Sequence, residues 1–528
     1  MPWPFSSPQA TGPAGRPGRD RSRAQLGWLV NAAGIVIAAG WFIALLVLHL
    51  KVIMQPGPQE FNEPTIWRAT WLLDHGRNPY ALKELPAAAY CFDPLYNYAM
   101  RALKPVFGID YTGHRLFNLM LLLASLGLLV RLMCRAGAGL GIALLSAVLY
   151  YGMCLGNIMI TARPDLLGLF FFLLGLLVPW EKNYDRWPTA FGLGCALIAF
   201  HCKFYFALAG CATLLGMFLL RSRREAWWWG VGFFAALGLS LAGCNLLFPY
   251  YYIETVLVQQ GGAALNSNDA TSVMHTRMFF DRGWPFLLCI GLGAGTWLWR
   301  RERARRQGGT VAPPGAGSAG LERRLLVLGG IFLIFVVLVY FYMGRNAGAY
   351  FTYHLHLLLP LMLVLAAHAA ARPWLRLGFG LLLAGFVLTR LTIPPMSDSA
   401  PAYRRMEQLI LNCPGEILGI AAVTDIFDRT GRRVLHDGNT MFIPFAYAHN
   451  GDKDDPMVAV LHERMDQLDA EVTRKVAARA YALVFTEFDQ PYFCKTEVLK
   501  ANYDRVEQID YFTYFGHSPV RVWRPKPR

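Results

Sequence analysis

The stretch LGWLVNAAGIVIAAGWFIALLVLHL (Leu26–Leu50) contains no Asp, Glu, Lys or Arg in 25 residues. A helix of about 20 apolar residues is long enough to cross the hydrocarbon core of a bilayer. The run is too long for the core of a signal peptide, and no small-residue cleavage site stands at its end. We therefore expect an uncleaved first membrane span, preceded by a basic, disordered cytoplasmic segment (1–25) that is rich in Pro, Gly, Ser and Arg.

Similar apolar runs recur along the chain, whose 528 residues are 55% hydrophobic and only 16% charged. The runs are continuous rather than alternating, which excludes a barrel and indicates an α-helical polytopic membrane protein. The hydropathy pattern predicts about eleven transmembrane helices. We place them near Leu26–Leu50, Leu116–Met133, Leu140–Leu155, Leu166–Trp180, Pro188–Phe200, Phe204–Leu220, Trp227–Phe248, Trp284–Trp299, Leu325–Met343, Tyr353–Ala369 and Trp374–Leu388.

The basic residues predict which side of the membrane each loop occupies. The net charge of +15 comes from Lys and Arg that cluster in the short links between alternate apolar runs. Such clustering is the orientation signal of a membrane protein, so we do not expect nucleic acid as a partner. It assigns the N-terminus to the cytoplasm, and the loop 51–115 and everything after about residue 392 to the other side of the membrane.

The tail 393–528 has the composition of a water-soluble domain. ILGIAAVTD (Ile417–Asp425) and YALVFTEF (Tyr481–Phe488) are typical of buried strands, and 457–478 has helical periodicity. We expect a small C-terminal α/β domain outside the cytoplasm, with its boundary at the two prolines of 393–399. Cys413 and Cys494 could pair there if that compartment is oxidising.

Ionisable residues gather at the expected outer face of the bundle. They are Glu60 and Glu63 after the first span, Arg163, Lys203 and Arg345. Charged groups at a membrane face often mark function. Cations recognise phosphate, and a carboxylate can take a proton from a hydroxyl group. A lipid-linked phosphate sugar that approaches from the bilayer would need both kinds of group.

Each of these groups also has a purely structural explanation. The two glutamates suit the positive end of a helix. Arg163 could form an ion pair with Asp165 that only holds helices together, and Lys203 could extend to the interface. Arg345 could be an interfacial anchor. The cysteines show no metal-binding spacing, so no cofactor is required, although a divalent cation could join the carboxylates.

Several short motifs follow one another outside the apolar runs. They are the pair Glu60 and Glu63, GRNPY (Gly76–Tyr80), YCFDPLYNYAM (Tyr90–Met100), ARPDLLGLFF (Ala162–Phe171), the Lys203 turn and GRNAGAYFTYHLH (Gly344–His356). Their order resembles that of the C-type (GT-C) membrane glycosyltransferases that use polyprenyl-phosphate sugars, a group with the lipid A aminoarabinose transferase and the protein O-mannosyltransferases. The chain departs from relatives in two places. Its acidic pair consists of two glutamates rather than Asp then Glu, and it has Thr352, Tyr353 and His356 where relatives tend to have Asn-Tyr with a later acidic residue.

The resemblance implies a GT-C-like fold and transfer of a sugar from a polyprenyl-phosphate donor to a hydroxyl of a glycan, lipid or protein, with inversion, on the periplasmic side of a bacterial inner membrane. An acidic residue of the first outer loop would be the base, Glu60 first and Glu63 second, although spacing alone does not rank them. On one helix both would face the cavity, and each would raise the pKa of the other. The expected donor-phosphate residues are Lys203, Arg163 and Arg345, and the expected cleft residues are Tyr80, Tyr90, Tyr96, Tyr353 and His356.

Two functions of other classes stay open at this point. A transporter or flippase of lipid-linked sugars would need polar residues at mid-membrane and access from both sides, whereas the ionisable residues here gather at one face. A membrane scaffold whose outer domain binds cell-wall polymers would keep its activity in the tail alone and would not need the loop carboxylates.

Overall fold

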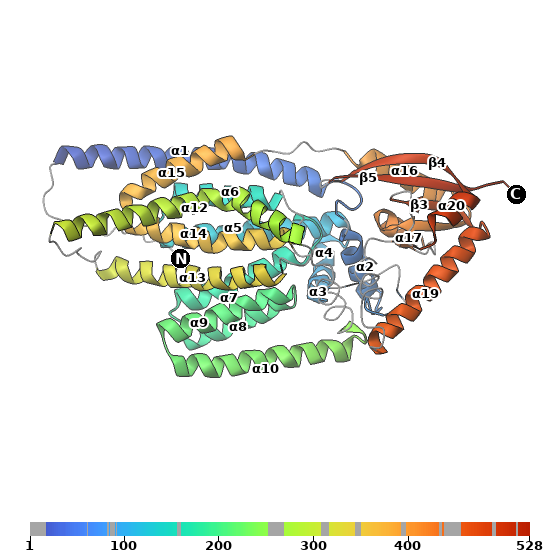
Figure 1. Ribbon diagram of the computed structural model, residues 1–528, viewed down its shortest axis with the longest axis horizontal. Helices are drawn as coiled ribbons and strands as arrows, with labels where there is room; N and C mark the ends of the chain where they lie inside the picture. The colour runs from blue at the N-terminus through green and yellow to red at the C-terminus, as the bar shows by residue number, and fades with distance from the viewer. Residues whose placement is uncertain are drawn as a thin grey trace.

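The computed structural model describes residues 17–60, 62–81, 84, 90, 92–155, 160–251, 269–307, 316–343, 350–391, 398–431, 436–437, 456–487, 493–513 and 516–527. Long helices run roughly along the long axis of the molecule and form one part (Figure 1). A smaller α/β domain forms the opposite end, and the two parts meet through a group of short helices (Figure 1).

Each of the eleven apolar runs forms a helix, as the hydropathy pattern predicts. By length and apolar composition, three of the described helices could cross a membrane, namely Gln25–Ile53, Tyr111–Arg135 and Arg223–Leu247. The full number of spans remains a prediction. The bundle helices are α1 (Pro17–Ile53), α5 (Tyr111–Arg135), α6 (Leu140–Leu155), α7 (Asp165–Glu181), α8 (Arg186–Phe200), α9 (Leu208–Leu220), α10 (Arg223–Leu247), α12 (Asp269–Arg306), α13 (Ala316–Met343), α14 (Tyr350–Ala371) and α15 (Pro373–Arg390).

The loop between α1 and α5 folds into three short helices at one end of the bundle. They are α2 (Glu63–Asp74), α3 (Leu95–Ala102) and α4 (Lys104–Phe107). The buried Asn97 amide joins α3 to α2, because its Nδ2 donates to Ile66 O at 2.9 Å and to Thr70 Oγ1 at 2.9 Å. These helices lie between the long helices and the C-terminal domain (Figure 1).

The C-terminal domain is a five-stranded mixed sheet covered by helices on both faces. The strand order is β2-β1-β3-β5-β4, with β1 parallel to β2 and β3, and β5 antiparallel to β3 and β4. Alternate strand residues point to opposite faces. Ile417, Leu483 and Val522 therefore pack with α16 (Ala400–Leu411) and α17 (Thr424–Thr430). The other face packs on α19 (Pro456–Ala477) and α20 (Thr496–Asn502). The strands are β1 (Glu416–Ile420), β2 (His436–Asp437), β3 (Tyr481–Thr486), β4 (Tyr503–Thr513) and β5 (Gly516–Pro525).

The structure corrects two expectations for this domain. The predicted strand over 417–425 ends at Ile420, because the chain turns there into a 3₁₀ segment (Ala421–Val423) and then α17. The pairing of Cys413 with Cys494 is not formed, since both thiols are free and they belong to hydrophobic clusters on opposite faces of the sheet. The predicted strand near 481 and the predicted helix over 457–478 are confirmed.

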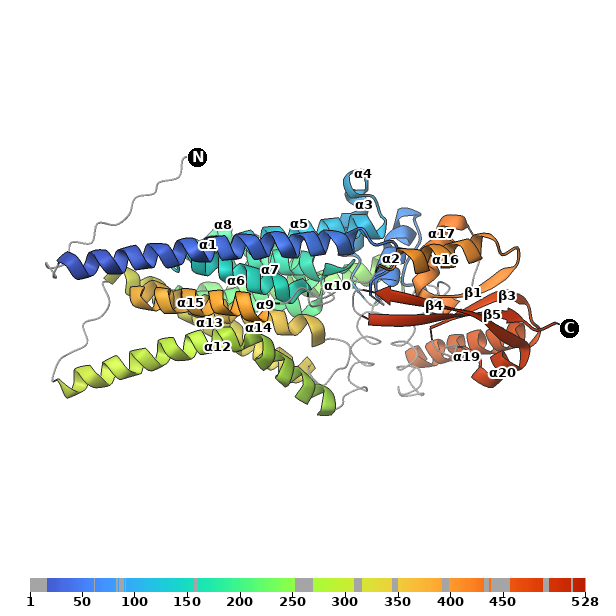
Figure 2. The same cartoon turned by 90° about the horizontal axis from the view of Figure 1, so that it is seen from above.

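The C-terminal domain holds the segment that follows α1. The Tyr511 hydroxyl donates to Pro58 O at 2.6 Å, and Gln59 Nε2 donates to Ser399 Oγ at 3.0 Å. Both contacts join residues more than 300 positions apart in sequence. They fix the backbone immediately before Glu60, and Figure 2 shows β4 reaching from the sheet toward this segment.

Glycines let α7 and α8 pack closely, which leads to a testable difference between two neighbouring positions. A Cβ added at Gly192 would lie 2.8 Å from Pro179 Cδ and 2.9 Å from Gly175 O, whereas at Gly194 it would meet nothing within 4 Å. We expect Gly192→Ala to destabilise the fold by about 1–3 kcal/mol through overpacking. Gly194→Ala should leave stability unchanged or slightly raised, because alanine favours helix.

Thermal unfolding of the two variants and the parent chain in the same detergent measures this difference. Equal midpoints for Gly192→Ala and Gly194→Ala would show that α7 and α8 do not depend on this contact.

Candidate active site

A chain of charged side chains joins three segments at the end of the bundle that faces the C-terminal domain. Arg163 Nη1 lies 3.0 Å from Glu60 Oε1, and Arg163 Nε lies 3.1 Å from Asp165 Oδ2. The other oxygen of Asp165 lies 2.6 Å from Lys203 Nζ. None of the four side chains is more than 11% exposed. Two carboxylates and two cations thus form one buried network, which we call the acidic–basic cluster.

Neighbouring backbone and aromatic groups position the charged side chains of this cluster. Asp165 is the first residue of α7, where the positive end of the helix favours a carboxylate. The segment before it is held by Asn118, whose Nδ2 donates to Arg163 O at 3.0 Å. The Phe92 ring lies 5.7 Å from Arg163 Cζ and 5.7 Å from Lys203 Nζ, so one aromatic face attracts both cations.

Glu60 lies in a turn before α2, with Glu63 N donating to Glu60 O at 3.2 Å. The expectation that Glu60 and Glu63 share one helix is therefore wrong, because α2 begins at Glu63. Asn62 donates to both oxygens of Glu60, from its backbone N at 3.0 Å and from its side chain at 3.1 Å. Burial of the carboxyl raises the pKa of Glu60 to about 7, although Arg163 acts in the opposite direction.

Glu63 has a different environment, in which every carboxylate lone pair is used. It forms a bidentate ion pair with Arg115, at 2.8 Å from Nε to Oε1 and 2.6 Å from Nη2 to Oε2. Ala162 N donates to Oε1 at 2.7 Å, and Gln59 N donates to Oε2. Both members of the pair are fully buried. The Glu63 carboxylate is thus held by Arg115 and two backbone amides, whereas Glu60 pairs with Arg163.

Arg115 was not among the residues selected from the sequence. Its guanidinium also donates to Gln55 O at 2.8 Å and to Gly57 O at 2.7 Å. One sequence signal could have identified it. Arginine is disfavoured at the outer end of a span, so its presence there indicates a specific partner.

The tyrosines expected in the cleft are buried in the structure. The Tyr80 hydroxyl donates to Phe92 O at 2.6 Å, and the Tyr90 hydroxyl donates to Asn97 Oδ1. Tyr96 OH lies 3.3 Å from His114 Nδ1. Tyr80, Tyr90 and Tyr96 have no exposed surface. Tyr80 and Tyr90 support Phe92 from within, while Tyr96 packs against His114 and Phe117.

Three further predicted residues cannot be placed beside the cluster. Arg345 lies outside the described residues. Tyr353 and His356 belong to α14, but their side chains are outside the described part of the chain. Their roles remain predictions.

Among the described residues, Asp93, His201 and Cys244 bring three candidate metal-ligand atoms within 4.8 Å of one another. His201 Nδ1 lies 3.2 Å from Asp93 Oδ1, and its Nε2 lies 2.8 Å from Ser240 Oγ. Burial works to lower the pKa of His201, but hydrogen bonds with Asp93 and Cys244 outweigh it and raise the pKa to about 9. This set of nitrogen, sulfur and oxygen atoms has the chemistry of a zinc site. Asp93 and His201 also form a direct ion pair with each other, which is a second explanation for their position.

No protein-family model matches the sequence, and no curated protein sequence matches it. The solved structures that are similar to this chain include two that align with nearly its whole length. The arabinofuranosyltransferase AftD from Mycobacteria has 15% identity and a TM-score of 0.43, covering 94% of this chain and 40% of that chain. ArnT from Cupriavidus metallidurans, in the apo state, has 13% identity and a TM-score of 0.42, covering 96% of this chain and 100% of that chain. This chain therefore spans less than half the length of AftD.

The Glu63–Arg115 pair leads to a prediction about stability. Arg115→Met leaves Glu63 buried without its cation, so we expect a loss of about 3–5 kcal/mol in the free energy of unfolding. Arg131→Met, on the same helix, removes only an exposed ion pair with Glu181 and should change stability little.

Unfolding midpoints of both variants in one detergent measure this difference. The double variant Arg115→Met with Glu63→Gln should recover part of the loss, because the uncompensated charge is gone. An Arg115→Met protein as stable as Arg131→Met would contradict a structural role for the pair.

Proposed function

We propose that the protein is an inverting glycosyltransferase that acts at the periplasmic face of a bacterial inner membrane. It would transfer a sugar from a polyprenyl-phosphate donor to an acceptor hydroxyl of the cell envelope. The observation that carries this proposal is the buried Glu60 carboxyl, with a pKa near 7, held 3.0 Å from Arg163 in the acidic–basic cluster. A carboxyl group that can accept a proton and two cations that can bind phosphate lie together, which supports this proposal.

Glu60 would serve as the general base. A base works best when its pKa lies near the operating pH, and burial gives Glu60 that property. The acceptor oxygen attacks the anomeric carbon while its proton passes to the Glu60 carboxylate. The bond from the anomeric carbon to the phosphate oxygen breaks, and the polyprenyl phosphate leaves with the electron pair. Attack opposite the leaving group inverts the configuration.

Arg163 and Lys203 would stabilise the phosphate of the donor as negative charge develops on it. Both cations contact Asp165, which holds them 5.7 Å from the same ring, that of Phe92. Cations that are already oriented need no rearrangement as the charge develops. Arg345 is a third candidate for this role on the basis of the sequence.

The contrast between Glu60 and Glu63 supports Glu60 as the base. Glu63 accepts four hydrogen bonds and is neutralised by Arg115. A carboxylate in that environment has no remaining lone pair for an acceptor proton. Glu60 is bound only by Asn62 and Arg163 among the contacts described, and Arg163 has a second carboxylate partner in Asp165.

The position of the cluster favours transfer over transport of lipid-linked sugars. Glu60 lies directly before α2, which Figure 1 shows between the long helices and the C-terminal domain, and its ion pair with Arg163 places the cluster at that end of the bundle. A transporter would need such groups near the membrane centre, with access from both sides. A transferase needs them where the phosphate of a lipid donor meets an acceptor at the membrane surface.

Glu60→Gln tests the base directly. We expect transfer to fall by about 100- to 10,000-fold, because the amide cannot accept the proton. The variant should still fold, since Arg163 keeps its ion pair with Asp165. Asp74→Asn is a matched control from the same loop, because Asp74 forms an ion pair with the more exposed Lys104. Purified protein in lipid, a set of radiolabelled polyprenyl-phosphate sugars and a membrane extract as acceptor provide the assay.

The same assay gives a pH prediction. Glu60 must lose its proton to act as a base, so the transfer rate of the parent chain should rise with pH through a midpoint near 7. Full activity of Glu60→Gln would exclude Glu60 as the base. Movement of labelled lipid across vesicles without transfer to any acceptor would establish the transport function instead.

A further inference from the structure

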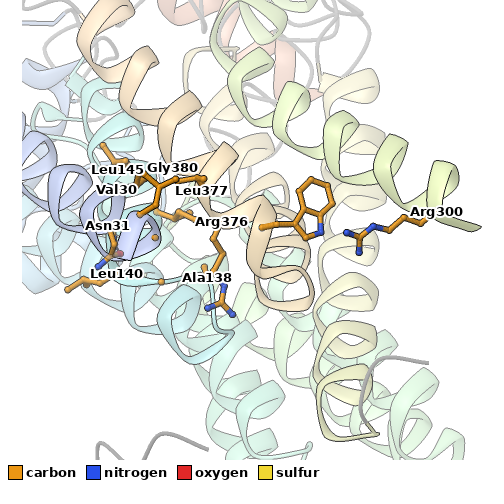
Figure 3. A pocket seen from close by; sticks show the side chains of 15 residues that line it. Val30, Asn31, Ala138, Leu140, Leu145, Arg300, Arg376, Leu377 and Gly380 are labelled. Atoms are coloured by element: carbon orange, nitrogen blue, oxygen red, sulfur yellow. The ribbon is translucent and has the colours of Figure 1, made fainter. Parts of the chain in front are cut away.

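A second site lies at the opposite end of the bundle from the acidic–basic cluster. It is a groove of about 870 Å³ between the first turns of the described part of α1, the α5–α6 connection, α12 and α15. Figure 3 shows Arg300 and Arg376 on different helices of its wall, and Leu145 with Val30 on the side of α1. The function proposed above does not use this groove.

The length of α1 separates the two sites. Leu26 lines the groove, and α1 continues to Ile53 before the chain reaches Glu60. That length of helix spans about 40 Å at about 1.5 Å per residue. The distribution of basic links predicts that the groove end of the bundle faces the cytoplasm, which would place the groove at the depth of the inner leaflet.

Two guanidinium groups of the groove lack a carboxylate partner among the described residues. Arg376 Nε donates to Ala369 O at 3.0 Å and its Nη2 to Ala370 O at 3.4 Å, at the carboxyl end of α14. The Arg300 guanidinium lies 4.9 Å from the centre of the Trp374 ring. Both arginines are exposed. They offer positive charge and free N–H donors to an anion.

The rest of the wall is mostly apolar and leaves room for a hydrocarbon chain. Leu26, Val30, Leu145 and Leu377 line it. Gly27 adds space, because a Cβ built there would meet no atom within 4 Å. A free phosphate ion would gain nothing from these apolar side chains, whereas an acyl chain would bury surface against them.

We propose that this groove binds an anionic phospholipid of the inner leaflet. The phosphodiester contacts Arg300 and Arg376, and one acyl chain lies along Leu26 and Val30. Arginine binds phosphate oxygens through paired N–H donors. Basic pockets between helices on the cytoplasmic side attract anionic lipid head groups, and a Trp such as Trp374 is typical of the membrane interface.

Native mass spectrometry of the full chain, exchanged into phosphatidylglycerol and phosphatidylcholine mixtures, tests the proposal. We expect Arg300→Gln with Arg376→Gln to lower phosphatidylglycerol retention by about 25-fold, since each basic residue near the surface contributes on the order of five-fold. Arg301→Gln with Arg303→Gln is the matched control. These two exposed arginines lie on the same helix over Trp297 and Trp299, outside the groove, and their loss should change retention little.

Gly27→Phe tests the apolar part without changing a charge, and should also reduce retention because the ring fills the space of the acyl chain. Equal losses in the two double arginine variants would reduce the effect to general surface charge and overturn the proposal. Two other results would also overturn the proposal. One is retention of phosphatidylcholine equal to that of phosphatidylglycerol, and the other is displacement of the bound lipid by inorganic phosphate as effective as displacement by phosphatidylglycerol. The readout is lipid retention, so it is independent of glycan transfer.

Discussion

The buried ion pair between Glu63 and Arg115 is the interaction on which this end of the molecule depends. The Arg115 guanidinium binds the carbonyls of Gln55 and Gly57, and the Glu63 carboxylate accepts from the backbone of Gln59 and Ala162. One pair thus connects α5, the start of α2, the segment after α1 and the segment before α7. Because a broken buried pair leaves an uncompensated charge, all four must be in place together. The backbone on each side of Glu60 and just before Arg163 is positioned as a result.

The C-terminal domain also holds the segment that leads to Glu60. Tyr511 and Ser399 bind Pro58 and Gln59, so the two residues before Glu60 are held by a domain that begins more than 300 residues later. Gly57 adopts φ +73°, a left-handed conformation that favours glycine. A side chain there would meet the Tyr511 hydroxyl at 2.8 Å. The domain is therefore part of the structure that fixes the proposed base.

The sequence predicts elements that depend on local composition, and it fails where distant segments meet. Continuous apolar runs identify the bundle helices, and most of the residues in the acidic–basic cluster are visible as charges beside those runs. β4 was missed because YDRVEQIDYFT is an edge strand with many polar side chains, so it lacks a buried-strand pattern. The different environments of Glu60 and Glu63 depend on Arg115, which lies 52 positions from Glu63. No spacing rule predicts such a pair.

The two glutamates show how a fold can maintain a carboxyl group in an unfavourable environment. The pKa of Glu60 rises from 4.5 in its ordinary environment to about 7 in the folded chain. The folded state therefore binds this proton more tightly than the unfolded state, and the contribution of Glu60 to stability falls as pH rises from 4.5 to 7. The cost at higher pH is on the order of 3 kcal/mol. Glu63, neutralised by Arg115 and bound by two backbone amides, carries its charge in the same region with every oxygen paired. Two carboxylates three residues apart thus have opposite environments: Glu63 is neutralised by Arg115, and Glu60 has a pKa near 7, which is the property that the proposed base requires.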